Sequence, residues 1–326
     1  MATLQLYRLR IQPQSATLSP WHADTLFGHL CWEAFWEGGA QGLADFLAPF
    51  RTGSPPFVFS DGFPDDLFPR PLLPPQELDA TDQVARERAM DRAKKTQDIQ
   101  WLTQAQFESV LRGERLTADS PAPPIRELTQ LTLKNQINRL TGTTGADEDD
   151  EEASGRLYPV TESAFVREGH ARASAIITFY LWAQNESHLQ SAVRWMNLLA
   201  RGGYGKRKTV GYGRFRVLNC ELFTLDVPDN ANGIVTLANF VPAMSDPHHG
   251  YYRTRVKYGK LGEPATLTDV ADSPFKFPLL MLAAGSTFYS NTGLGYVGRL
   301  VENIHPKNST IVQGAFAPAI PIRLPN

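Results

Sequence analysis

The stretch Arg201–Arg216, with the sequence RGGYGKRKTVGYGRFR, organises the interpretation of this 326-residue chain. It holds five glycines, six basic residues and three aromatic residues, and it contains no acidic residue. Glycines permit positive φ angles and close backbone approach, and loop N–H groups with Lys and Arg side chains can bind a flexible polyanion. Aromatic faces in such a loop can stack bases. The alternative is an exposed hairpin whose charges are only solvated.

The flanking sequence places this loop between a helix and a strand. Residues His188–Ala200 repeat apolar side chains at helical spacing, and Phe215–Leu218 begins a strand-like run. A phosphate-binding P-loop has the opposite order and reads GxxxxGK followed by Ser or Thr, whereas Lys206 here precedes Arg207. The pattern therefore excludes that type of nucleotide site. The candidate polyanion-binding residues of the loop are Arg201, Gly202, Gly203, Tyr204, Gly205, Lys206, Arg207, Lys208, Gly211, Tyr212, Gly213 and Arg214.

Composition limits the function classes. The formal net charge is −2, so any polyanion site must be a local basic patch offset by acid elsewhere. The two cysteines, Cys31 and Cys220, lie in apolar contexts without metal-ligand spacing, which indicates buried thiols in a reducing compartment. We expect no metal and no cofactor. The chain opens directly into structured sequence, and no apolar run is long enough to cross a bilayer, so we expect a soluble, cytoplasmic protein without a membrane partner.

The N-terminal part predicts a strand, a helix and a proline-rich arm. Leu4–Ile11 alternates as a strand, and Asp24 is a candidate N-cap for a helix that ends at Gly38-Gly39. Pro55–Pro75 combines prolines with aromatic residues, which favours an ordered, extended arm over a disordered linker. Asp79–Gly113 is helical in character.

A long hairpin and a core strand follow. NQINRL, from Asn135, and GRLYPVTESAFV, from Gly155, are predicted as hairpin arms on either side of the acidic run Asp147–Glu152. That run must be exposed; we assign it no function, because nothing fixes a metal-binding geometry. Ala173–Ala183, ASAIITFYLWA, predicts a buried strand.

These elements give a fold-class prediction. The order β, α, insertion, β, α, β over residues 1–226 is the skeleton of a ferredoxin-like (RRM-like) domain with an insertion at about residues 55–170. Residues 227–326 are predicted as a second ferredoxin-like domain, so the fold class is α+β. Its expected strands are Ile234–Phe240, Tyr252–Tyr258, Phe277–Ala283 and Ala315–Ile322.

Within that second part, the sequence YYRTRVKYGK has a period of two. The alternation places Arg253, Arg255 and Lys257 on one strand face, which makes them further candidates for polyanion contact. The alternative is an exposed strand that its charges protect from aggregation.

With these motifs in place, the sequence resembles the RAMP proteins of CRISPR–Cas systems. Within them it is most similar to the Cas-five-like subunit family, subunit 4, of type III-A (Csm) effector complexes. The resemblance covers nearly the whole chain and rests on an N-terminal strand and four ordered motifs. These are ADTLFGHLCWEAF (Ala23–Phe35), PPFVFSDGFP with PRPLLPP (Pro55–Pro75), NQINRLTGTT (Asn135–Thr144) and GGYGKRKTVGYGRF (Gly202–Phe215).

The resemblance implies two ferredoxin-like units and a non-catalytic role in antiviral defence. It implies binding of the 5′ handle of the guide CRISPR RNA and docking between the large polymerase-like subunit and a backbone RAMP subunit. Target RNA would be reached through the assembled complex. Asn135–Thr144 would form a thumb-like element, with Asn135, Asn138 and Arg139 as RNA contacts. The loop departs from the RRM octamer at Arg214, so we expect recognition by loop and backbone rather than by paired aromatic residues on a sheet.

Two alternatives remain at this stage. A metal-independent endoribonuclease that processes precursor CRISPR RNA would need a general acid or base, and its candidates are His22, His29, His248 and His249. No recognisable catalytic constellation surrounds them. A scaffold subunit would use the basic loop only to bind an acidic protein.

Overall fold

A computed structural model describes residues 2–74, 98–117, 120–135, 157–167, 175–262 and 274–325, together with positions 87, 90 and 96. Its N-terminal part is an antiparallel sheet in the order β2-β8-β1-β9, with β3 also paired to β8. The strands are β1 (Ala2–Pro13), β2 (Phe57–Phe59), β3 (Phe63–Pro64), β8 (Ile177–Ala183) and β9 (Phe215–Val227).

The long pairing of β1 with β9 joins the two ends of this part of the chain. Its register runs from Ala2 opposite Val227 to Pro13 opposite Phe215. With the elements between β2 and β8 set aside, the chain runs β1, α1, β2, β8, α4 and β9, the element order of the predicted skeleton; the ferredoxin-like unit itself stays a prediction. The predicted α+β fold class is confirmed, and the strands predicted around β1, β8 and β9 are present.

The helices of the described residues are α1 (Ala23–Arg51), α3 (Gln104–Leu111), α4 (Glu186–Gly202) and the 3₁₀ turn η1 (Lys208–Val210). Helices α1 and α4 cover one face of the sheet and α3 packs on the other. Helix α4 extends beyond the predicted limits, whereas α3 is shorter than the predicted helical stretch Asp79–Gly113, in which Trp101–Leu102 is a strand. The predicted end of the first helix at Gly38-Gly39 is confirmed, because Gly39 has non-helical backbone angles, with φ of 62°, and two helical segments meet there within α1. The prediction that Asp24 is the N-cap is wrong: His22 occupies that position, and Asp24 lies buried in the first turn.

The C-terminal part forms a second antiparallel sheet in the order β11-β14-β10-β16-β15. Its strands are β10 (Gly233–Thr236), β11 (Gly250–Tyr251), β14 (Thr287–Tyr289), β15 (Tyr296–Val301) and β16 (Gln313–Ile322), and the hairpin β12 (Thr254–Lys257)–β13 (Leu279–Leu282) lies beside it. Residues 228–262 and 274–325, as described, contain no helix. A second ferredoxin-like unit and a domain boundary at residue 226 therefore stay predictions.

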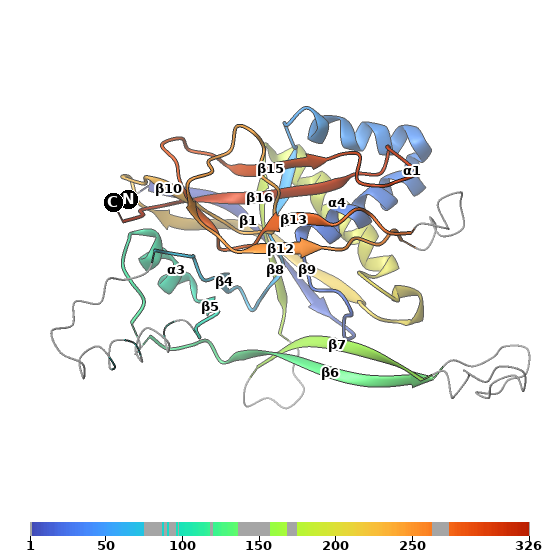
Figure 1. The fold of residues 1–326 in the computed structure, drawn as a ribbon, viewed down its shortest axis with the longest axis horizontal. Coiled ribbons are helices and arrows are strands. Elements are labelled where there is room, and N and C mark those ends of the chain that lie inside the picture. The colour runs from blue at the N-terminus through green and yellow to red at the C-terminus, as the bar shows by residue number, and fades with distance from the viewer. Residues whose placement is uncertain are drawn as a thin grey trace, which may run out of the picture.

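The insertion folds back on the first sheet and then projects from it. It contains β4 (Phe68–Pro69), β5 (Trp101–Leu102), α3, and the hairpin β6 (Ile125–Asn135)–β7 (Leu157–Arg167). The hairpin runs alongside the body of the molecule (Figure 1). Its first arm, β6, ends at Asn135, where the predicted arm began. Asn138, Arg139 and Asp147–Glu152, for which the sequence made predictions, lie outside the described residues.

Acidic residues of the proline-rich arm tie the hairpin and β1 together. Asp66 accepts from Arg10 at 2.7 Å, and Asp65 accepts from Arg167, at the end of β7, at 2.7 Å. The hydrogen bonds and the negative charge of Asp66 raise the pKa of Arg10, so Arg10 stays charged and paired with Asp66 on this face of the sheet. The arm is thus ordered, as its apolar content predicted.

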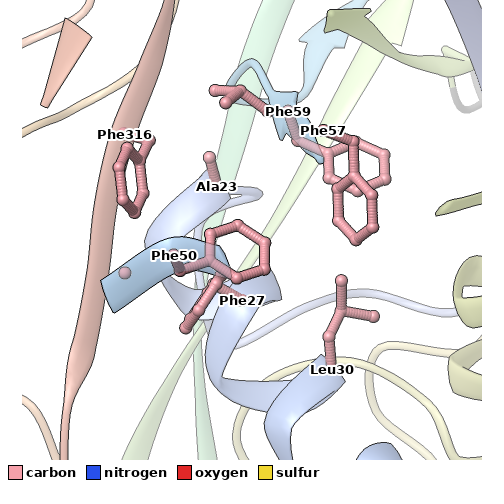
Figure 2. Close-up of a pocket in the computed structure, with 9 residues that line it drawn as sticks. Ala23, Phe27, Leu30, Phe50, Phe57, Phe59 and Phe316 are labelled. Atoms are coloured by element: carbon pink, nitrogen blue, oxygen red, sulfur yellow. The ribbon is translucent and has the colours of Figure 1, made fainter. Parts of the chain in front are cut away.

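Helix α1 packs between the two sheets, and the core is shared. In Figure 2, Phe27 and Leu30 of α1, Phe50 near its end, Phe57 of β2 and Phe316 of β16 surround a cavity of about 20 Å³. Phe27 and Phe50 meet edge to face, with ring centroids 4.9 Å apart. Interiors are close-packed, so the aromatic rings leave little space for any larger side chain.

Gly314→Ala should destabilise the protein by about 1–3 kcal/mol. A Cβ at this position of β16 would lie 2.4 Å from Cγ of Phe27, which is buried. The matched control is Gly28→Ala in α1, where a Cβ meets nothing within 4 Å. It should be neutral or stabilising by up to about 1 kcal/mol, because alanine favours helix. Urea unfolding of both variants tests this, and equal midpoints would contradict it.

Candidate nucleic-acid interface

The glycine-rich loop joins α4 to β9 through a backbone that only glycine adopts readily. Helix α4 begins at the Asn185 cap and ends at Gly202, as the apolar spacing predicted. After it, φ is 81° at Gly203, 80° at Gly205, 98° at Gly211 and 65° at Gly213. Glycine populates these angles without a Cβ penalty, so the loop can fold tightly back on itself.

Tyr204 fixes the loop to the core. Its side chain is 1% exposed and stacks on Trp21, with ring centroids 4.4 Å apart. Its hydroxyl donates to the Pro20 carbonyl at 2.6 Å and accepts the His22 N–H at 2.9 Å. Burial raises the pKa of the phenol well above its usual value. The prediction that Tyr204 contacts RNA is therefore wrong for this structure: its ring is unavailable for stacking and serves as an anchor.

Two of the glycines, Gly205 and Gly213, are required by the close packing of the loop on the protein. A Cβ at Gly213 would lie 1.8 Å from the Tyr204 carbonyl oxygen, and one at Gly205 would lie 2.7 Å from Cβ of Ser19. Gly203 and Gly213 are themselves buried. Close backbone approach, one of the two roles expected for the glycines, thus takes place within the protein.

The loop N–H groups are largely used internally, which corrects the expectation that the backbone would bind phosphate. The Gly205 N–H donates to Nε2 of His29 at 2.8 Å and the Lys206 N–H to Oγ of Ser19 at 3.1 Å. The N–H groups of Gly213 and Arg214 donate to Ala16 and Ser15. Because these donors are already paired, a polyanion on this loop would have to be bound mainly by side chains.

The basic side chains remain on the surface. Arg201, Lys206, Arg207, Arg214 and Arg216 are exposed, while Lys208 is half-buried. Gln12 accepts from Arg216 at 2.9 Å and so holds its guanidinium against the sheet edge. The loop therefore presents a cluster of cations on a backbone that a buried tyrosine anchors.

The β6–β7 hairpin packs one face against this cluster. The Arg207 guanidinium donates to the Tyr158 hydroxyl at 2.7 Å and lies 4.5 Å from its ring centroid. The Tyr212 hydroxyl donates to Glu162 at 2.5 Å, and Glu162 also pairs with Lys134 at 3.5 Å. The sequence did not reveal these partners, because they lie some fifty positions away along the chain. Asn135 is the exposed last residue of β6, and the rest of the thumb-like motif lies outside the described residues.

On the opposite face of the hairpin, two leucines of β6 are exposed. Leu131 and Leu133 are 66% and 63% exposed, and their cross-strand neighbours include Pro159 and Thr161. Side chains alternate between faces along each strand, so these leucines point away from the loop. The hairpin thus presents Tyr158, Glu162 and Lys134 to the loop and exposes Leu131 and Leu133 on its other side.

The predicted basic face of β12 is not free, and this prediction is wrong in part. Lys257 forms an ion pair with the buried Asp24 and donates to Thr25 at 2.6 Å. Arg255 lies 3.3 Å from Nε2 of His22, so it also faces α1, although it remains exposed. Arg253 precedes β12 and is exposed. Lys257 is paired within the protein because the buried carboxylate of Asp24 needs a cation as its partner.

The histidines considered for catalysis have structural positions. Burial lowers the pKa of His22 to about 4 and that of His29 to about 3. The His29 ring also accepts the Gly205 N–H through Nε2, so it is occupied as a neutral acceptor. His249 stacks on Tyr289, with centroids 5.0 Å apart, and His248 is exposed. These contacts do not assemble an acid–base pair.

Lowering the pH should weaken the fold through His29. Its folded pKa of about 3 lies below the unfolded value of 6.5, so between these values only the unfolded chain binds the proton. Stability is therefore full above about pH 6.5 and falls as the pH drops. His29→Gln removes this contribution. Between pH 7 and pH 4 the variant should therefore lose less free energy of unfolding than the unsubstituted protein, by on the order of 2–3 kcal/mol. Denaturant titrations at several pH values test this; parallel curves would refute it.

Among the residues that the structure describes, no helix has the length and apolar character needed to cross a membrane. Within the same residues, no cluster of three or more His, Cys, Asp or Glu side chains could hold a metal ion.

The fold and this surface define an α+β protein with a loop-borne cationic cluster, and the fold has counterparts among solved structures. No protein-family model and no curated protein matches the chain. A chain of a Csm1–Csm4 cassette crystallised with pppApA matches with a TM-score of 0.58 and 17% identity, covering 99% of this chain and 100% of that chain. A chain of the cassette with cA4 gives 0.59 and 15% over the same shares.

A second assembly contains the same fold. A chain of the Csm3–Csm4 subcomplex of the type III-A CRISPR–Cas interference complex matches with a TM-score of 0.53 and 12% identity, covering 98% of this chain and 100% of that chain. The component that these assemblies share by name is Csm4. The chain therefore has a Csm4-like fold over nearly its whole length.

Proposed function

We propose that this protein is a Csm4-like subunit of a type III-A CRISPR ribonucleoprotein that binds the 5′ handle of the guide CRISPR RNA. The observation that carries the proposal is the near-complete match to chains from both a Csm1–Csm4 and a Csm3–Csm4 assembly. One fold found beside two different partners is what a bridging subunit requires. The partners proposed here are the large polymerase-like subunit and a backbone RAMP subunit.

The cationic loop supports RNA as the ligand. Arg201, Lys206 and Arg214 are exposed on a loop whose backbone is rigidly anchored by Tyr204. Because the backbone of the loop is already ordered, RNA binding needs to order only its side chains, which lowers the entropic cost of binding. The handle would therefore be held chiefly by side-chain contacts to phosphate, with the hairpin positioned beside it to approach the guide–target duplex.

The protein is proposed to be non-catalytic. In an endoribonuclease, a general base must reach the attacking 2′-hydroxyl. His22 and His29 are half-buried; the His22 ring faces Arg255, and the His29 ring accepts a hydrogen bond from the loop. Incubation of the purified protein with repeat RNA should give no discrete cut; cleavage that a histidine substitution abolishes would favour the endoribonuclease alternative.

The first experiment is to purify the protein with its neighbouring subunits and to sequence the RNA that accompanies it. We expect one uniform 5′ handle, crosslinked within Arg201–Arg216. Heterogeneous RNA, or assembly that survives RNase while loop variants fail to assemble, would instead favour a scaffold that binds only protein.

Removing loop charge should lower both RNA affinity and its salt dependence. For Lys206→Ala/Arg214→Ala, the slope of log K against log salt should fall by roughly 0.7 for each phosphate that the protein no longer neutralises. The matched control, Arg51→Ala/Arg299→Ala, removes the same charge from exposed residues whose partners are Glu302 and the Pro242 carbonyl. Fluorescence anisotropy of the labelled handle measures both; unchanged slope and affinity in the loop variant would reject the loop as the site.

A further inference from the structure

Three aromatic side chains gather on the exposed side of α1, and we call them the α1 aromatic patch. They are Trp32, Phe35 and Trp36, whose spacing of three and four residues places them on one helix face. Trp32 contacts both others, with ring centroids 5.8 Å from Phe35 and 6.0 Å from Trp36. Phe35 is 40% exposed and Trp36 is 49% exposed. Clustered exposed aromatics of this kind mark binding surfaces.

The patch borders the cationic loop. The Lys208 ammonium lies 5.1 Å from the ring centroid of Trp36, a cation–π contact. Gly202, the last residue of α4, fits between the two elements: a Cβ there would lie 3.8 Å from the Lys208 ammonium and 3.9 Å from a carboxylate oxygen of Glu33. The exposed Arg201 precedes it. Indole faces and loop cations therefore form one continuous surface.

The charges around the patch favour a polyanion over an acidic or basic protein. On one flank, Glu37 pairs with Arg194. On the loop side, Glu33 is half-buried, burial raises its pKa, and the charge of Lys208 acts against that rise. The acids are thus compensated within the fold, whereas Arg201 and Lys206 point to solvent. Cations interleaved with aromatic faces are the usual means of binding single-stranded nucleic acid.

We propose that Trp36 stacks a base of the single-stranded RNA whose phosphates contact the cationic loop. This inference rests on the proposed function and extends it to a second element of the fold. Trp32 holds the indole in place from behind, and Phe35 flanks it. Lys208 lies over the ring in the free protein; its flexible stem allows the ammonium to move to a phosphate while the base takes its place.

Crosslinking and affinity measurements on the full chain test this. The probe is a fluorescein-labelled oligouridine that carries 5-bromouridine. Trp36→Leu keeps an apolar side chain but removes the aromatic face, and it should weaken binding roughly 5-fold to 150-fold, the range expected for one stacked base. Trp36→Tyr keeps an aromatic face and should retain most of the affinity. Mass spectrometry should locate the crosslink on the peptide that contains Trp36.

Salt dependence separates this inference from the proposed function. Trp36→Leu should leave the slope of log K against log salt unchanged, because every phosphate keeps its cation, whereas Lys206→Ala/Arg214→Ala lowers the slope. The control Met244→Ala, at a fully exposed apolar residue, should bind normally. If the loop variant no longer binds RNA and Trp36→Leu still does, this inference fails and the proposed function stands. If both variants bind RNA normally, both fail. A Trp36→Leu protein that binds RNA normally but no longer binds a partner subunit would make the patch a protein interface.

Discussion

The buried hydroxyl of Tyr204 is the interaction on which the surface depends. It bridges the Pro20 carbonyl and the His22 N–H just before α1 begins, while its ring stacks on Trp21. The start of α1 and the end of α4 are therefore fixed to each other by one side chain. This contact anchors the loop backbone that carries the exposed cations, and hydrogen bonds from the loop to His29 and Ser19 add to it. A tyrosine in this place combines a large apolar face with a polar tip that must find partners when buried.

Contacts between residues far apart in the sequence also position the β6–β7 hairpin. Ser163 of β7 forms an isolated bridge with Thr17, and Arg167 pairs with Asp65 of the proline-rich arm. Tyr158 then meets Arg207 near the opposite end of that strand. Three segments of the chain therefore contact strand β7 of the projecting hairpin. Such contacts stabilise it, because a two-stranded hairpin on its own is at best marginally stable in water. The cationic loop and the hairpin consequently form one surface rather than two independent ones.

The sequence predicted the strands of the first sheet well, because runs of strand-forming residues mark them. Leu4–Ile11, which alternates imperfectly, and the strand-like run Phe215–Leu225 fall within β1 and β9. It failed where a residue type has two uses. Tyr204 is of a residue type that stacks on bases, but its side chain lies in the core. Glycines that could let a ligand approach the backbone instead let another segment of the protein pack closely against it. Lys257 fits a basic strand face by alternation, yet a buried carboxylate distant in sequence pairs with it. Such tertiary pairing leaves no local signal, and for the same reason the sequence did not single out Trp36.

The shared core also constrains when the chain can fold. Strand β1 lies at the N-terminus, but Arg8 finds its partner Glu221 213 positions later, and Asp24 meets Gln313 289 positions later. Contacts of such long sequence separation form slowly, because loop closure precedes any gain from them. During synthesis, the apolar side of α1 that packs on β16 lacks its cover until almost the entire chain has left the ribosome. The nascent protein is therefore exposed to aggregation for most of its translation, and protection by a chaperone or prompt assembly with a partner would matter more for it than for a protein of local contacts.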